Sequence, residues 1–238
     1  MSIDGEFITT LLENVTPKTF EVAGKTYSSE ALHNLPLPTE PPFPTVKLET
    51  LDSLVDYIKS NRDGQFEADS CQILCGHAVV QLFGKPQGEN RRRDILVDVH
   101  SGAQGYSFGS FFDLEQFRIQ LLTQFEPTPD RDKILQFIAK VTDEHVKTSQ
   151  DDGVSQTVNV RVGIATVASQ TVPSPVLLRP IRTFIEVEQP GGQFLFRMQS
   201  GKELPQAALF EIHTNWKREA AVLVKDYLAA KLEATILA

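Results

Sequence analysis

The chain has 238 residues, of which 41% are hydrophobic and 23% are charged, and its formal net charge is −8. This composition is typical of a globular protein with its own core, and the negative charge argues against a protein that coats nucleic acid by bulk electrostatics. The sequence holds no run of about 18 apolar residues and no signal-peptide pattern at its start. We therefore expect a cytoplasmic protein without a membrane span.

Residues 1–47 are expected to form an N-terminal arm ahead of a core domain over residues 48–238. The spacing of apolar residues predicts a short helix over 1–15 and a small hairpin over 20–27. Five of the ten residues over 35–44 are proline, so this stretch should be extended and polyproline-like. It is an SH3-type ligand, a stiff connector, or an arm that docks on its own or a neighbouring subunit.

The core domain begins with a helix and two strands in the sequence pattern. Residues 48–61 predict a helix that Thr50 caps, with an apolar stripe on one side. Residues 70–83 are apolar on both faces and are interpreted as one strand, and residues 92–100 as the next. The stripe of the helix consists of Leu51, Leu54, Val55 and Ile58.

Two short helices should follow the strands. Asp113 is the predicted cap of the first helix, and Thr128 with Pro129 begins the second. The polar turn over residues 149–153 is the candidate boundary inside the core domain. The residues expected to point inward from the first helix are Leu114, Phe117, Leu121, Leu122 and Phe125.

The pattern over residues 176–198 predicts the hairpin around which the chain is organised. Residues 181–188 alternate between two faces as a strand does, and residues 189–192 carry the Pro-Gly signature of a turn. Residues 154–164 predict another strand, and residues 215–236 a long final helix. Short turns between consecutive strands favour an α+β fold with a mainly antiparallel sheet, flanking helices and a proline-rich arm.

Arginine, glutamate and phenylalanine gather in the predicted hairpin. Arg and Glu on an exposed strand face form pairs within one subunit or between copies, and Arg with aromatic residues is typical of interface hot spots. Both alternatives stay open at this point. The candidate interface residues are Arg179, Arg182, Phe184, Glu186, Phe196 and Arg197, with Leu37 and Phe43 of the arm.

Cys71, Cys75, His77 and His100 are the residues with metal-ligand character. Their spacing fits no zinc pattern, and no oxyanion-hole sequence accompanies a Cys75–His77 nucleophile. We therefore predict no catalytic residue, no metal and no cofactor, with both cysteines as free thiols. A metal- or Cys-dependent hydrolase is kept as an alternative.

Arg91, Arg92 and Arg93 stand at the end of a loop. Three consecutive arginines can bind phosphate groups or an acidic partner surface. They can equally be a solvated turn that protects the edge of a sheet.

Four stretches, in this order, carry a family resemblance: LDSLVDYIKSN, RRDILVDVHS, FFDLEQFRIQLL and LLRPIRTFIEVEQPGGQFLFRM. Together they resemble the YfdQ-like proteins of tailed phages and prophages, a family of unknown function. The resemblance covers about residues 48–232, and residues 84–90 replace the family's glycine- and histidine-containing turn. It supplies no catalytic residues, and it implies an early, non-virion phage protein in an infected or lysogenic bacterium.

We expect a non-enzymatic protein that self-associates into a homo-oligomer or a larger assembly. Its main partner is then a second copy, with a host or phage protein as a further partner. The first alternative is a nucleic-acid-associated accessory factor in phage recombination or replication, which the net charge of −8 disfavours. The second alternative is the hydrolase.

Overall fold

A computed structural model describes residues 19–23, 25–28, 44–87, 90–141, 148–151, 156–162, 166–200, 205–212 and 215–238. The chain divides into two compact units, Met1–Pro42 and Phe43–Ala238. In the first unit, β1 (Thr19–Val22) pairs antiparallel with β2 (Lys25–Ser28), which confirms the hairpin predicted over 20–27. The helix predicted over 1–15 and most of the proline-rich stretch, with Leu37 and Phe43, lie outside the described residues.

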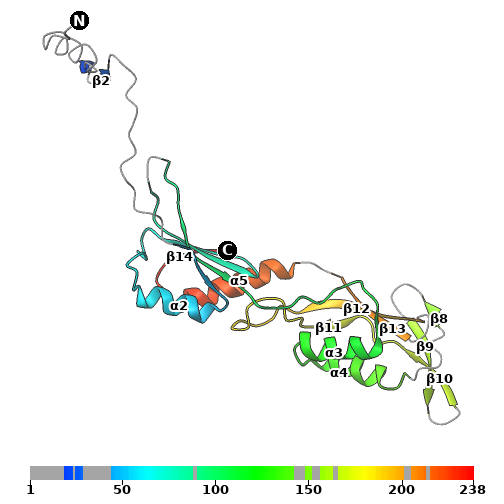
Figure 1. The fold of residues 1–238 in the computed structure, drawn as a ribbon. Helices are drawn as coiled ribbons and strands as arrows, with labels where there is room; N and C mark the ends of the chain where they lie inside the picture. Colours follow the sequence, from blue (N-terminus) through cyan, green and yellow to red (C-terminus); the bar gives the residue numbers. More distant parts are fainter. Residues whose placement is uncertain are drawn as a thin grey trace, which may run out of the picture. The chain divides into compact units, whose positions relative to one another are not determined.

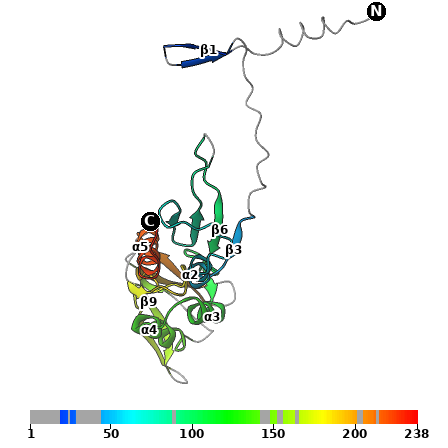
Figure 2. The same ribbon diagram turned by 90° about the vertical axis from the view of Figure 1, so that its left-hand side faces the viewer.

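One five-stranded sheet is built from the beginning and the end of the second unit. Its order is β14-β4-β5-β6-β3, with parallel pairs at both edges and antiparallel pairs between them (Figures 1 and 2). Two helices, α2 (Leu51–Ser60) and α5 (Trp216–Ala229), contribute buried residues to the core of this sheet. The strands are β3 (Val46–Leu48), β4 (Gln72–Cys75), β5 (Val79–Phe83), β6 (Ile95–His100) and β14 (Thr235–Leu237).

A second, antiparallel sheet is formed by residues that lie between β6 and α5 in the sequence. Its order is β11-β12-β13-β7, and α3 (Leu114–Gln124) and α4 (Pro129–Ile138) share its core. The two helices lie side by side in Figures 1 and 2. The strands are β7 (Phe112–Asp113), β11 (Val176–Leu178), β12 (Gly192–Ser200) and β13 (Pro205–Glu211).

A smaller three-stranded sheet has the order β10-β9-β8 and is also antiparallel. Gln156 links it to β12, because its Nε2 donates to the carbonyl of Met198 at 2.7 Å and its Oε1 accepts from the amide of Met198 at 2.9 Å. This side chain is buried, so both hydrogen bonds are shielded from water. The strands are β8 (Thr148–Asp151), β9 (Gln156–Val162) and β10 (Thr166–Thr171).

The predicted α+β fold with mainly antiparallel pairing is confirmed. The three predicted helix caps are confirmed as well. The side chains of Thr50, Asp113 and Thr128 accept from backbone amides three residues later, at 3.2, 2.8 and 3.1 Å. Each bond satisfies an amide that lacks a partner inside its own helix, which is why these helices begin where they do.

Two predicted elements have the wrong extent. Residues 70–83 are two strands, β4 and β5, because a turn begins at Gly76, whose amide donates to the carbonyl of Val79 at 2.8 Å. A Cβ at Gly76 would lie 3.0 Å from that oxygen, so the turn favours glycine. The final helix ends at Ala229, and Thr235–Leu237 forms the edge strand β14 in place of further helical turns.

The strand predicted over residues 181–188 is also wrong, because residues 179–191 are irregular. The reason is the side chain of Gln189, which is 3% exposed. Its Oε1 accepts from the amides of Arg182 and Thr183 at 2.9 and 3.2 Å. Its Nε2 donates to the carbonyls of Phe184 and Val187 at 3.0 and 3.4 Å. One side chain thus satisfies the backbone groups that a neighbouring strand would otherwise bind.

Candidate functional site

The irregular segment over residues 179–191, which we call the connecting segment, joins the two larger sheets. Phe184 is 1% exposed and belongs to the core of the five-stranded sheet, whereas the flanking strands β11 and β12 belong to the other core. The Thr183 hydroxyl donates to the carbonyl of His77 at 2.5 Å. Glu186 Oε1 accepts from the amide of Leu51, the first residue of α2, at 2.7 Å. Glu186 therefore stabilises the start of that helix.

Arg182 of the connecting segment contacts both a carboxylate and aromatic rings. Its side chain is buried, and Nη1 lies 2.8 Å from Glu211 Oε1. The guanidinium carbon lies 4.0 Å from the centre of the Trp216 ring, and Phe108 is close as well, at 5.9 Å. Burial lowers the pKa of the guanidinium, while the carboxylate of Glu211 acts in the opposite direction.

The other hairpin candidates also make contacts within one chain. Arg179 pairs with the carboxylate of Glu188 and lies near Glu126, at 3.9 Å. Phe196 is buried in the core of the antiparallel sheet, and Arg197 beside it on β12 is half-buried. These contacts match the alternative of pairing within a subunit for Arg179 and Arg182. A role of any of them in assembly stays a prediction.

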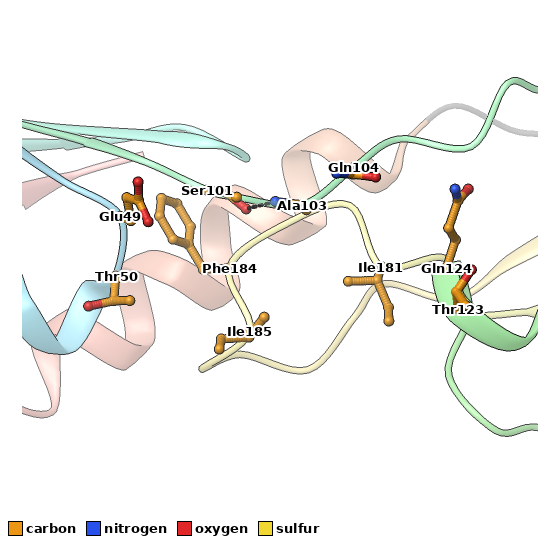
Figure 3. A pocket seen from close by; sticks show the side chains of 11 residues that line it. Glu49, Thr50, Ser101, Ala103, Gln104, Thr123, Gln124, Ile181, Phe184 and Ile185 are labelled. Atoms are coloured by element: carbon orange, nitrogen blue, oxygen red, sulfur yellow. Dashed lines mark hydrogen bonds between the residues drawn. The ribbon is translucent and has the colours of Figure 1, made fainter. Parts of the chain in front are cut away.

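Two hollows adjoin the connecting segment. The first, of about 440 Å³, is drawn in Figure 3, where Ile185 lies near Thr50 at one end and Ile181 lies near Thr123 of α3 at the other. Glu49 is its one ionisable lining residue among the described residues. The second hollow, of about 580 Å³, contains Arg182 and Trp216 in its wall.

The residues with metal-ligand character are not brought together. Cys75 is buried in β4, His77 lies in the following turn with its ring edge-on to Trp216 at 5.0 Å, and His100 pairs with Asp98 at 2.8 Å. Burial lowers the pKa of His77. Within the described ranges, no three His, Cys, Asp or Glu side chains are placed to hold a metal ion. Cys75 is the last residue of β4, so His77 does not lie on the same strand.

Burial raises the pKa of the Cys75 thiol to about 12, so the reactive thiolate is scarce at neutral pH. We expect no reaction of either cysteine with Ellman's reagent at pH 7.5 in the native protein. In guanidinium chloride both Cys71 and Cys75 should react at once. Rapid release of one equivalent of thionitrobenzoate from the native protein would contradict this and would favour the Cys-dependent hydrolase.

The arginine triplet does not act as one cluster. Arg93 Nη1 donates to the carbonyls of Ser70 and Gly84 at 2.6 and 2.7 Å, so this side chain holds two loops together. Arg92 is exposed and lies 3.8 Å from Asp94. Arg91 occupies a turn with a φ of 52°. Phosphate binding by Arg91 and Arg92 stays a prediction.

Large apolar side chains are exposed on α3 and in the connecting segment. Ile119 and Leu122, on the outer side of α3, are 54% and 50% exposed, and Ile185 is 78% exposed. The prediction that Leu122 points inward is wrong. The signal was present in the sequence, because Ile119 lies away from the stripe that Leu114, Phe117 and Leu121 form at the helical period.

Comparisons with protein-family models, with curated proteins and with solved structures found no match. No helix in the described part of the chain is long and apolar enough to cross a bilayer.

Proposed function

We propose that this chain is a non-enzymatic protein that self-associates through the outer face of α3. The supporting observation is the exposure of Ile119 and Leu122 on a helix that already buries Phe117 and Leu121 on its inner face. Exposed apolar side chains that gather on one face are typical of protein interaction sites. Ile185 lies at the far end of the hollow that Thr123 borders, so it is not counted as part of this face.

A second copy suits this face because the pattern is self-complementary. Ile119 and Leu122 are three residues apart, which places them one above the other on the helix. If two α3 helices pack antiparallel about a two-fold axis, Ile119 of one copy faces Leu122 of the other, and the reverse contact forms as well. Exposed Glu115 and Arg118 would then lie at the polar rim that such interfaces usually have.

The biological setting of this proposal comes from the resemblance to YfdQ-like proteins. In that setting the chain is an early phage or prophage protein in the cytoplasm of an infected or lysogenic bacterium. A host or phage protein is a further partner on the same face. Neither setting nor partner is needed for the test of self-association.

Replacement of Ile119 and Leu122 by aspartate should reduce the protein to a monomer. The charges would repel across the two-fold axis and would remove the apolar contact. The matched control is Val222→Asp, which also puts aspartate at an exposed apolar position of a helix, on α5. Size-exclusion chromatography with light scattering gives the native mass of all three proteins.

We expect a multimeric mass for the unaltered chain and for Val222→Asp, and a monomeric mass for the double variant. If the double variant keeps the multimeric mass, α3 is not the interface. If Val222→Asp also becomes monomeric, the effect does not belong to the α3 face, and the proposal is equally wrong.

A further inference from the structure

The first hollow continues along α3. A shallow hollow of about 430 Å³ follows this helix from its start, and it shares Thr123 and Gln124 with the first hollow. In Figure 3 the two shared residues lie at the end opposite Glu49. The two hollows therefore form one open groove that runs from the start of α3 to the connecting segment. We call it the glutamine groove.

Three glutamines form a row along the helical side of this groove. Gln116, Gln120 and Gln124 are four residues apart, so their side chains follow one another about every 6 Å along α3. The Oε1 atoms of Gln120 and Gln124 are buried without a partner among the described residues, which leaves the Nε2 donors as the accessible ends of these two amides. Gln116 is exposed. The row therefore presents side-chain donors to the groove at a regular spacing.

The spacing of the row fits an extended peptide. Residues of an extended chain rise about 3.3 Å each, and alternate residues are oriented alike, so carbonyls on one side repeat about every 6.6 Å. Such carbonyls need hydrogen-bond partners when a bound peptide leaves water. A row of amide donors at nearly the same repeat supplies these partners along the length of the peptide, which a compact small molecule would not use.

Apolar side chains lie along the same groove. Ile119 and Ile185 are both more than half exposed, and Ile181 lies near Thr123 in Figure 3. Side chains of an extended peptide point alternately to opposite sides, so every second residue would face these isoleucines. Pockets for alternate side chains are a common source of specificity in the recognition of extended peptides. The groove therefore favours a peptide whose central residues are apolar at alternate positions.

The ionisable residues that line the groove are all acidic. Glu49 lies at the end near α2, and Asp113 and Glu115 lie at the start of α3. Among the described residues, no lysine, arginine or histidine lines either hollow, and Arg118, the one basic residue of α3, is exposed outside the lining. Negative charge at both ends favours a peptide with basic residues on both sides of its apolar centre.

We propose that the glutamine groove binds an extended segment of a partner protein, with alternating apolar residues in its centre and lysine or arginine at both ends. Gln116, Gln120 and Gln124 would donate to its carbonyls, and Ile119 and Ile185 would contact its apolar side chains. This inference does not rest on self-association. Because Ile119 also belongs to the outer face of α3, the partner segment and a second copy would compete for it.

Three pools of fluorescein-labelled peptides of about ten residues test this with the immobilised full chain. Peptides of the first pool carry two lysines at each end, and their central positions alternate between Ile or Val and Thr or Ser. The second pool has glutamates in place of the lysines, and the third has only Ser and Gly in its centre. We expect the chain to retain peptides of the first pool and to retain neither of the other pools.

Variants connect the binding to the row of glutamines. The most strongly retained peptide is titrated in solution and followed by fluorescence anisotropy. Replacement of Gln116, Gln120 and Gln124 by alanine removes the donors and keeps a strong helix former at each position, so the variant should fold. It should bind at least about tenfold more weakly, the equivalent of about 1.4 kcal/mol. The matched control is Gln136→Ala, exposed on α4 outside the groove, which should bind unchanged.

A further variant, Leu122→Asp, separates this inference from self-association. Leu122 belongs to the outer face of α3 but does not line the groove, so this variant should bind the peptide at least as tightly as the unaltered chain. Weaker binding would place the peptide on the outer face and would overturn the proposal. A chain that is monomeric and still retains the first pool would contradict self-association alone.

The proposal is overturned if no peptide of the first pool is retained, or if the glutamate-ended pool is retained equally well. Undiminished affinity of the folded triple alanine variant overturns it as well, with circular dichroism as the check of folding. If that variant fails to fold, Ile185→Asp decides. Ile185 is mostly exposed, so this substitution should leave the fold intact, and unchanged affinity would place the peptide elsewhere.

Discussion

Replacement of Phe184 by alanine should lower the free energy of unfolding by about 3–5 kcal/mol. The ring is fully buried in the core of the five-stranded sheet, although it belongs to a segment whose flanking strands lie in the other core. Its loss would leave a cavity in that core and would weaken the attachment of the connecting segment to it. Urea denaturation at one fixed protein concentration measures the effect, since association adds a concentration-dependent term.

The matched control is Ile185→Ala, because the neighbouring side chain is mostly exposed. We expect its free energy of unfolding to change by less than about 0.5 kcal/mol. Equal effects of the two substitutions would mean that Phe184 is not anchored in the five-stranded core. The connecting segment would then have another conformation in solution.

Replacement of Gln189 by alanine should lower the free energy of unfolding by at least about 3 kcal/mol. The amide side chain forms four hydrogen bonds with the backbone of residues 182–187. Each buried group that loses its partner costs about 1–3 kcal/mol, although water that enters the space would recover part of this. Hydrogen exchange at the amides of Arg182 and Thr183 should become much faster at the same time.

Glu188→Ala is the control for this experiment. Glu188 is exposed, and its ion pair with Arg179 lies at the surface, so its loss should cost about 0–1 kcal/mol. If Gln189→Ala is as mild as Glu188→Ala and leaves exchange at residues 182 and 183 slow, the four hydrogen bonds do not hold the segment.

Local signals in the sequence predicted the helices well. Thr50, Asp113 and Thr128 cap the helices that they were expected to cap, and the stripe of α2 is buried throughout. A cap and a stripe depend on residues a few positions apart, so the sequence alone contains the information.

The connecting segment could not be predicted in this way. Its residues alternate as a strand would, yet the adjacent Thr183 and Phe184 are both buried, and Ile185 is exposed. The conformation follows from the hydrogen bonds of Gln189 and from contacts with the distant His77 and with the first turn of α2. The alternation of apolar and polar residues along the segment does not reveal these contacts. Tertiary contacts therefore override the local preference for a strand.

The same limit applies to both candidate sites. Arg182 stood out in the sequence as an interface residue, but its burial depends on Glu211 and Trp216, which lie about 30 positions away. The place of Ile119 away from the apolar stripe of residues 114–124 was readable, but only the packing of α3 shows that both Ile119 and Leu122 remain outside. The sequence pattern can thus indicate that an apolar side chain lies off the buried face, whereas the fold decides which side chains stay exposed.

The native mass of the unaltered chain in solution is the most direct test of self-association. Sedimentation equilibrium over a range from about 1 to 50 µM gives this mass without assumptions about molecular shape. Self-association through α3 predicts a mass at least twice the 26.5 kDa of one chain, falling toward that value on dilution if the contact is reversible. A mass of 26.5 kDa at every concentration would contradict it.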